Sequence, residues 1–218
     1  MLNFLKQLLD WIYKNKCYVC GSTKESVKVC SECFDSLEER GADLVKIPMV
    51  SKVKVYSSGI YTKNIQKLIR GLKYHQQKEL AYYLAKFMYD YGQKCGLDSD
   101  YVIVPVPLHP KRHKERGYNH MELVAAEYCR LSGCKPNTSL IKRVKDTKPQ
   151  YRLSSKEREA NLKNAFSVDK SSYNGEKLII MDDILTTGTT VKEIIKEFKK
   201  AGVKDITIFA TSCTASFS

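Results

Sequence analysis

Apolar positions along the chain follow two alternating patterns, one typical of buried strands and the other of helices. Four short segments predict strands that are covered on both faces. They are Val53–Ser57, Tyr101–His109, Lys177–Met181 and Ile206–Ala210. Between these segments, apolar residues recur every three or four positions, which is the spacing of the buried face of a helix.

This helical spacing is clear in four places. The first helix begins near Thr62, the second ends at Gly92, the third ends at Gly133 and the fourth follows the strand Lys177–Met181. The apolar residues that mark them are Ile65, Leu68, Ile69 and Leu72; Leu80, Leu84, Phe87, Met88 and Tyr91; Leu123, Val124, Tyr128 and Leu131; and Val191, Ile194, Ile195 and Phe198. Strands that alternate with helices predict an α/β protein whose mainly parallel sheet carries helices on both faces.

The length of the chain fits one such domain with a small appendage, because 218 residues bury a full α/β core and leave some to spare. We expect a helix and a metal module over residues 1–46 and the α/β domain over residues 47–218. A change in composition near Glu38–Pro48 suggests the linker between them. The sequence contains no internal repeat and no low-complexity segment.

The first residues predict an amphipathic helix, with apolar side chains at Leu2, Leu5, Leu9 and Ile12. Lys6 and Asp10 interrupt the apolar stretch too soon for a signal peptide or a membrane span. We expect the helix to pack against the rest of the protein, and we expect a cytoplasmic protein without an integral membrane span. Thiols stay reduced in that compartment, so the eight cysteines do not indicate a disulfide framework.

Four of these cysteines have the spacing of a metal site: Cys17, Cys20, Cys30 and Cys33. Two C-x-x-C pairs separated by nine residues offer four thiolates, which suit a structural zinc ion in a closed tetrahedral site. Gly21 follows the first pair and helps the backbone to turn beneath the ion. A redox-active pair is the alternative, but neither pair has the strand-to-helix context of a redox motif.

The segment KLIIMDDILTTGTTV, Lys177–Val191, carries the strongest sign of a ligand site. A buried strand leads to two acids, Asp182 and Asp183, and then to a connection, Leu185–Thr190, that opens a helix. The backbone N–H groups at a helix N-terminus favour an anion. The residues that we expect to hold a phosphate are Thr186, Thr187, Gly188, Thr189 and Thr190. Since the acids can accept hydrogen bonds from sugar hydroxyls, the segment predicts a site for a phosphorylated ribose. The alternative is an ordinary turn whose acids only cap the helix.

A second segment with candidate chemistry follows the strand Tyr101–His109, where Lys111, Arg112, Lys114 and Arg116 crowd what we interpret as a loop. Ligands of open parallel sheets bind outside the carboxyl ends of the strands. If both segments face one crevice, the basic residues supply positive charge for a pyrophosphate. Taken alone, such a run of charges is more often a solvated face.

A long polar segment, Arg143–Phe166, separates these two parts of the sequence. Ser154 and Ser155 precede a short predicted helix in which Glu157 lies near the N-terminus. A polar excursion of this length inside a compact domain is often a lid or a binding flap, and a disordered surface insert is the alternative.

Lysine and arginine outnumber aspartate and glutamate by 37 to 24, which gives a formal net charge of +13. An excess of this size favours polyanionic partners such as nucleic acid, phosphorylated metabolites or an anionic membrane surface. Basic residues stand beside aromatic ones in Leu68–His75 and Lys111–His120, a combination that suits single-stranded nucleic acid. Tyr74 and Tyr118 could equally be packed in the core.

Together these segments resemble the ComF family of competence-associated proteins, which join a zinc-finger-like N-terminus to a phosphoribosyltransferase-type domain. The resemblance rests on the four cysteines and on five further segments. They are LIRGLKYH (Leu68–His75), VPVPLHPKRHKERGYNHMEL (Val104–Leu123), R-x-x-x-T-x-x-Q (Arg143–Gln150), REANLKNAF (Arg158–Phe166) and MDDILTTGTT (Met181–Thr190). The last segment looks like the phosphoribosyl pyrophosphate (PRPP) motif of type I phosphoribosyltransferases. The family pattern usually has glutamine where this chain has His120.

The resemblance implies a role for each part of the site. Asp182 and Asp183 would contact the ribose hydroxyls, the threonine turn would hold the 5-phosphate, and Lys111, Arg112 and Arg116 would face the pyrophosphate. It also implies magnesium bound with PRPP, a role in natural transformation, and single-stranded DNA as a partner. The DNA-uptake helicase and other competence proteins are further partners that it suggests.

Two functions of different classes follow from these residues. In the first, the site binds or senses PRPP while the protein holds single-stranded DNA and assists its uptake. In the second, the protein is an active phosphoribosyltransferase that acts on a nucleobase or a nucleotide-related acceptor. No segment of the sequence plainly specifies a base, so we favour the first.

Overall fold

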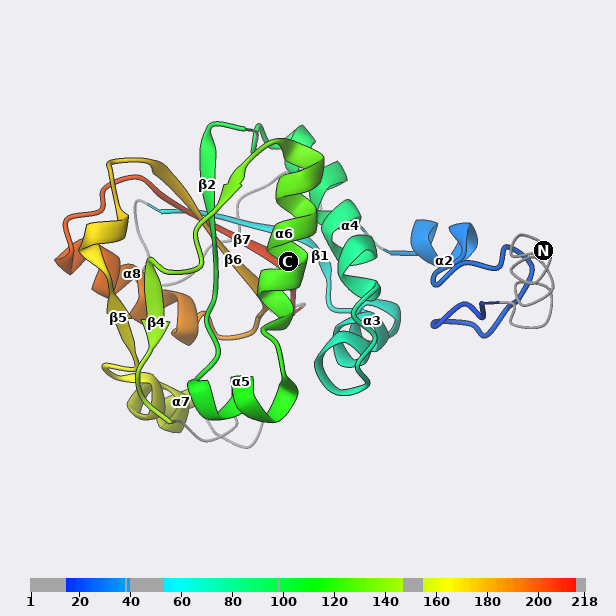
Figure 1. Ribbon diagram of the computed structural model, residues 1–218, viewed down its shortest axis with the longest axis horizontal. Helices are drawn as coiled ribbons and strands as arrows, with labels where there is room; N and C mark the ends of the chain where they lie inside the picture. Colours follow the sequence, from blue (N-terminus) through cyan, green and yellow to red (C-terminus); the bar gives the residue numbers. More distant parts are fainter. Residues whose placement is uncertain (1–14, 38, 40–52, 98, 147–154, 215–218) are drawn as a thin grey trace, which may run out of the picture.

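The computed structural model describes residues 15–37, 39, 53–97, 99–146 and 155–214 (Figure 1). The predicted N-terminal helix and the proposed domain boundary near residue 46 lie outside these residues. In chain order the elements are α2 (Ser31–Asp35), β1 (Lys54–Ile60), α3 (Lys63–Tyr74), α4 (Leu80–Lys94), β2 (Tyr101–Pro105), α5 (Pro110–Arg116), α6 (His120–Ser132), β3 (Lys135–Pro136), β4 (Ile141–Arg143), α7 (Ser155–Leu162), β5 (Phe166–Val168), the 3₁₀-helix η2 (Lys170–Ser172), β6 (Lys177–Leu185), α8 (Thr189–Lys200) and β7 (Ile206–Cys213).

The centre of the domain is a five-stranded sheet in the order β1-β7-β6-β2-β3, and every neighbouring pair is parallel. Helices α3, α4 and α6 cover one face, and α8 covers the other together with the small antiparallel pair β4–β5 (Figure 1). The predicted α/β fold is therefore confirmed. No helix within the described ranges is long and apolar enough to cross a membrane.

Side chains of β6 divide between the two faces because successive residues of a strand point in opposite directions. Ile179 and Met181 pack with the helices α3, α4 and α6, whereas Leu178 and Ile180 pack with α8 and the β4–β5 pair. All four are at most 1% exposed. This alternation continues past Met181 and decides where the two acids of the strand point.

The strands β2 and β6 are neighbours at the point where the chain reverses its direction across the sheet. After β2 the chain moves outward to β3, and after β6 it moves the other way to β7. Such a switch in strand order leaves a crevice at the carboxyl ends of the two strands, which is where open α/β sheets bind ligands. The acids lie near the carboxyl end of β6 and the basic residues follow β2, as the expectation of a single crevice requires.

Three local predictions need correction. The basic residues after β2 form the short helix α5 and not a loop, because Pro110 occupies its first turn and Gly117 closes it with a left-handed φ of 82°. The strand β6 continues to Leu185, so the acids lie within the strand and the connection to α8 is shorter than predicted. The segment Arg143–Phe166 begins at the end of the strand β4 and ends at the start of β5, and these two strands pair, which the charged composition concealed.

The four-cysteine module docks on the outer side of α3. The ring of Tyr18 lies so close to Gly71 that a Cβ atom added there would be 2.7 Å from the ring carbon Cε1. The Tyr18 hydroxyl lies 2.6 Å from His75 Nδ1, and Lys67 Nζ donates to the carbonyl of Val19 at 2.9 Å. Since α3 also reaches the crevice, it connects the module to the predicted ligand site.

Candidate functional site

Asp182 and Asp183 point to opposite faces of the sheet, as the alternation along β6 requires. Asp183 follows the parity of Met181 and faces α3 and α6, while Asp182 follows Ile180 and faces the β4–β5 side. The backbone N–H of Asp183 donates to Oδ1 of Asp182 at 2.9 Å. The two carboxyls are therefore close together but lie in different surroundings.

Asp183 is held by two side chains that the sequence did not assign to the site. Its Oδ2 atom forms an ion pair with Lys73 of α3 and lies 2.8 Å from Nε2 of His120 at the start of α6. The exposed fractions of the three side chains are 14% for Asp183, 19% for Lys73 and 7% for His120. Burial alone would raise the pKa of Asp183, but the Lys73 ammonium and the His120 hydrogen bond outweigh it and hold that pKa below its usual range. Asp183 is thus ionised.

The His120 ring bridges Arg116 and the carboxylate of Asp183. Arg116 Nη1 lies 3.0 Å from His120 Nδ1, on the opposite side of the ring from Asp183. Burial lowers the pKa of His120 to about 4, against the opposing effect of Asp183. The ring is therefore neutral near pH 7, and we assign the tautomer in which Nδ1 accepts from the guanidinium and Nε2–H donates to the carboxylate.

Asp182 differs from Asp183 because its pKa is raised and not lowered. Burial, and next the charge of Asp183, raise the pKa of Asp182 to about 7, although Lys73 and Arg143 act in the opposite direction. Arg143 ends β4, is only 6% exposed and packs over the ring of Phe166 at 5.6 Å. The site thus contains one ionised acid and one acid that titrates near neutrality.

The turn after β6 combines a left-handed glycine with neighbouring threonine hydroxyls at the start of a helix. Gly188 is buried and precedes the first residue of α8 with a left-handed φ of 70°, a conformation that a side chain would strain. The hydroxyls of Thr187 and Thr189 lie 2.7 Å apart, one on each side of the glycine. Thr186 is exposed and Thr190 is half-buried. The turn therefore presents hydroxyls around the N-terminus of a helix.

The predicted basic residues of α5 do not all reach the same place. Arg112 and Arg116 are one helical turn apart and half-buried, and both act electrostatically on groups of the crevice. Lys111 is exposed, and its ammonium lies 3.6 Å from Asp146. The structure therefore links Arg116 to Asp183 through His120 and places Arg112 near Arg116 and Arg143. Lys111 pairs with the segment that follows β4.

Three site residues were missed at the sequence level: Lys73, His120 and Arg143. Lys73 follows the last buried leucine of a helix, where a lysine normally faces solvent. All three belong to segments that resemble the ComF family, and this resemblance was the only signal that could have singled them out.

The four cysteines meet at one point, as predicted. All four sulfur atoms lie within 4.8 Å of one another, and the Sγ atoms of Cys20 and Cys30 are 3.7 Å apart. Four thiolates at about 2.3 Å from one zinc ion would be separated by about 3.8 Å, so the cluster fits such an ion. Backbone N–H groups of Ser22 and Cys30 lie 3.4 Å from the sulfur atoms of Cys20 and Cys17, the N–H···S pattern of a metal knuckle.

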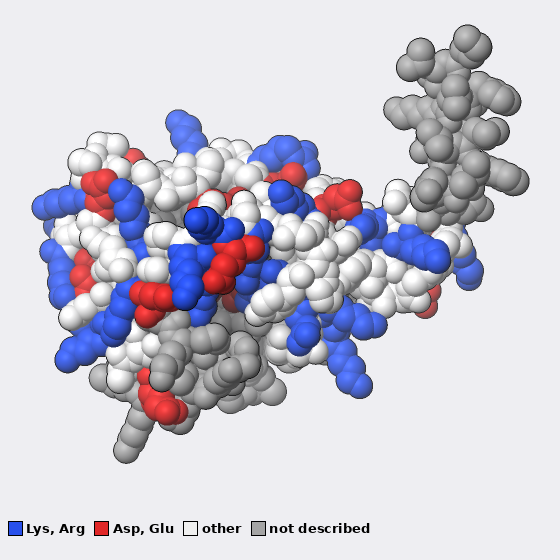
Figure 2. All heavy atoms as spheres, turned by 60° about the horizontal axis from the view of Figure 1, so that its bottom comes forward, with Lys and Arg blue, Asp and Glu red and all other residues white. Residues whose placement is uncertain are grey.

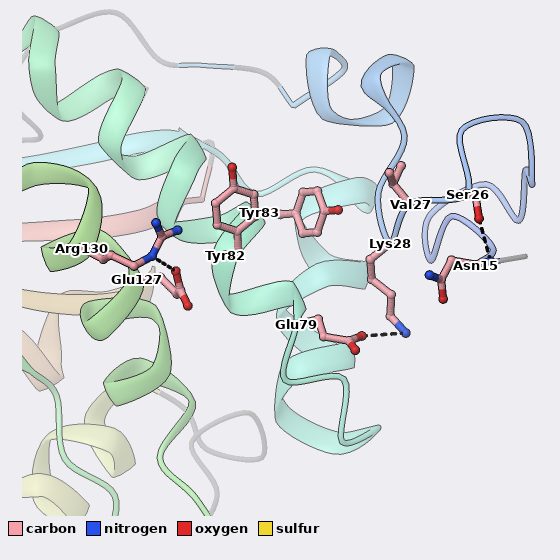
Figure 3. A pocket seen from close by; sticks show the side chains of 9 residues that line it. All are labelled: Asn15, Ser26, Val27, Lys28, Glu79, Tyr82, Tyr83, Glu127 and Arg130. Atoms are coloured by element: carbon pink, nitrogen blue, oxygen red, sulfur yellow. Dashed lines mark hydrogen bonds and ion pairs between the residues drawn. The ribbon is translucent and has the colours of Figure 1, made fainter. Parts of the chain in front are cut away.

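A separate cleft of about 510 Å³ opens between the module and the helices α4 and α6 (Figure 3). Its lining includes Tyr82 and Tyr83 of α4, and two ion pairs flank it: Lys28 with Glu79 at 3.2 Å, and Arg130 with Glu127 at 2.9 Å. Positive and negative charges are balanced here. The cleft therefore differs from the crevice at the ends of β2 and β6.

Comparison with known proteins assigns the fold and the family. The family model of the phosphoribosyl transferase domain matches residues 133–216. Competence protein F of Haemophilus influenzae is 32% identical over 88% of this chain and 88% of its own length. DNA utilization protein YhgH of Salmonella typhimurium is 31% identical over the same shares. Competence protein ComFC of Streptococcus pneumoniae is 26% identical over 89% of this chain and 98% of its own.

These matches and the parallel sheet define a phosphoribosyltransferase-type protein with an N-terminal four-cysteine module. The similarity to the competence proteins extends over nearly the whole chain. The chain belongs to the ComF family of competence-associated proteins.

Proposed function

We propose that this protein binds PRPP in the crevice between β2 and β6 and assists DNA uptake during natural transformation. One observation carries the proposal: an acid pair and two arginines lie at the carboxyl ends of adjacent parallel strands, where the order of the sheet reverses. A phosphorylated sugar that also bears a pyrophosphate needs both kinds of group.

Each part of the ligand has a counterpart in the site. Among the described residues, no hydrogen bond joins Oδ1 of Asp183 or Oδ2 of Asp182, so these atoms can accept from ribose hydroxyls. The threonine turn around Gly188 would bind the 5-phosphate at the N-terminus of α8. Arg112 and Arg116 would bind the pyrophosphate, since a guanidinium matches two phosphate oxygens at once.

Two metal ions complete the proposal. Magnesium would bind with the pyrophosphate near Asp182 and Asp183, and when bound it neutralises phosphate charge. Zinc would be held by the four cysteines as a structural ion. Metal analysis of the purified protein tests the second assignment: we expect about one zinc per chain, and a Cys20→Ser, Cys30→Ser variant that keeps its zinc would contradict it.

The proposed PRPP site can be tested by measuring how PRPP and its two parts, ribose 5-phosphate and pyrophosphate, stabilise the protein. With magnesium present, ribose 5-phosphate and pyrophosphate should each raise the melting temperature, and PRPP should raise it more than either. PRPP occupies the phosphate turn and the arginines together, so its effect should shrink in Gly188→Ala and in Arg112→Ala. A shift for pyrophosphate alone, with none for PRPP beyond it, would count against the site.

The second candidate function is turnover, and the two arginines favour it. Arg112 and Arg116 lie where a departing pyrophosphate would gain negative charge, and groups positioned at developing charge lower a reaction barrier. Release of pyrophosphate from PRPP with magnesium, measured against nucleobases and single-stranded oligonucleotides, decides between binding and catalysis. Release that depends on one acceptor identifies an enzyme.

Single-stranded DNA is the proposed macromolecular partner, on the basis of the charge of +13. Many Lys and Arg side chains, with acidic ones between them, lie on the face shown in Figure 2. The helices α5 and α7 lie on this side of the molecule (Figure 1). Neutralisation of DNA phosphates releases counterions, so affinity must fall steeply as salt rises. An affinity that stays constant over a range of salt concentrations would contradict this part of the proposal.

A further inference from the structure

Tyr74 is the one aromatic residue of the crevice whose ring is left largely exposed in the described structure. It is 59% exposed, whereas Tyr118 in the neighbouring helix junction is only 7% exposed. Tyr74 lies two positions after Leu72, which is buried, and therefore points away from the core. It directly follows Lys73, whose ammonium pairs with Asp183. An apolar ring so close to a polar site needs an explanation.

Two contacts tie the Tyr74 end of α3 to Arg116 of α5. The guanidinium of Arg116 lies over the Tyr74 ring at 5.4 Å from its centroid, and the same guanidinium bonds His120, which bonds Asp183. Next to it, Gln76 donates to the carbonyl of Arg116 at 3.3 Å. The end of α3 is thus tied to the end of α5, and the tyrosine ring is held one guanidinium away from the acid pair.

We propose that Tyr74 is a stacking platform for a nucleobase beside the phosphoribosyl site. This inference rests on the proposed function, and it supplies the base-contacting group that the sequence did not reveal. A base offers a flat apolar face to the ring, while Arg112 and Arg116 give the surroundings the positive charge that a nucleotide phosphate requires. The base comes either from a free nucleobase acceptor or from a single strand of DNA.

Tyr82 provides a matched control. It is 39% exposed, and Arg130 lies over its ring at 5.7 Å, so its local contacts are similar to those of Tyr74. However, Arg130 is paired with Glu127, and Glu79 lines the same cleft (Figure 3). Both carboxylates are paired with cations, so this cleft has no net positive charge to attract a phosphate. An exposed tyrosine with an arginine over it is therefore not sufficient, and the surroundings of Tyr74 distinguish the two.

The test compares Tyr74→Leu, Tyr74→Phe and Tyr82→Leu in the full chain. Affinity for short oligothymidylate is measured by fluorescence anisotropy, and affinity for adenine, guanine and uracil by calorimetry with PRPP and magnesium present. Tyr74→Leu should weaken binding in at least one assay by about five- to hundredfold, the range expected for one lost base–aromatic stack. Tyr74→Phe and Tyr82→Leu should retain the affinity of the unmodified chain.

The two binding assays distinguish the two possible sources of the base. A loss for oligothymidylate alone identifies a strand of DNA, and a loss for free bases alone identifies an acceptor. A strand containing 2-aminopurine adds a direct readout, because stacking quenches its emission and Tyr74→Leu should restore it. Unchanged affinities of Tyr74→Leu in every assay would overturn the inference. The proposed function would fail differently, through the absence of PRPP binding in the unmodified chain.

Discussion

Replacing Asp183 by asparagine should destabilise the fold, whereas the same replacement at Asp182 should not. Asp183→Asn removes the partner of the Lys73 ammonium, which is only 19% exposed. Removal of one partner of a buried pair destabilises a protein by about 3–5 kcal/mol, because the remaining charge is left buried. His120 can still donate to the asparagine oxygen, so the loss comes from the charge and not from the hydrogen bond. We therefore expect about 3 kcal/mol, the lower end of that range.

Asp182→Asn changes much less because burial and its charged neighbour already raise the pKa of Asp182 to about 7. Near pH 7 the carboxyl is neutral in about half of the molecules, and the amide resembles that neutral form. Urea denaturation followed by circular dichroism gives the free energy of unfolding of both variants. Adding Lys73→Met to Asp183→Asn should recover most of the loss, since it removes the stranded ammonium. Equal losses in the two single variants, or no recovery in the double variant, would refute this reasoning.

Three further predictions concern pH and packing. The pKa of Asp182 rises from its ordinary value of 3.8 to about 7 in the folded state. The folded state therefore binds more protons than the unfolded state between these pH values, and its stability should fall as the pH rises through this window. Urea titrations at several pH values should show that Asp182→Asn removes this dependence of stability on pH. His120 behaves in the opposite way: its pKa falls from 6.5 to about 4, so stability should be lost as the pH drops through that window, and His120→Gln should remove that loss. Gly71→Ala gains about 1 kcal/mol of helix propensity, yet its Cβ would lie 2.7 Å from the Tyr18 ring and 2.5 Å from Leu80. A net loss of stability is therefore expected from thermal denaturation, and a net gain would show that the module does not dock tightly on α3.

The parts of the fold that depend on local patterns could be predicted from the sequence. The strand at Lys177 and the helix that carries Val191 follow from the period of their apolar residues, and the structure contains both. The four cysteines could be grouped by spacing alone, since a knuckle is a local feature. That the sheet is parallel followed from the alternation of strands and helices, whereas the sequence did not predict that β2 and β6 are neighbours.

The surroundings of the acids could not be predicted, because they depend on contacts between distant parts of the chain. Lys73 and Asp183 meet only when α3 has packed beside β6, and no local pattern distinguishes Lys73 from a solvent-exposed lysine. The helix α5 was missed for a different reason. Its run of basic residues suggested a loop, although Pro110 and Gly117 were visible helix boundaries.

Equilibrium titration of the full chain with PRPP and magnesium tests the central claim most directly. Calorimetry above pH 7, where Asp182 is mostly ionised, should show binding to the unmodified chain and a loss of about ten- to hundredfold in Asp182→Asn, the effect of one charged hydrogen bond. Asp90→Asn makes the same change on α4, where the carboxylate pairs with Lys86, and should bind normally. Undiminished affinity in Asp182→Asn would contradict a phosphoribosyl site at the end of β6.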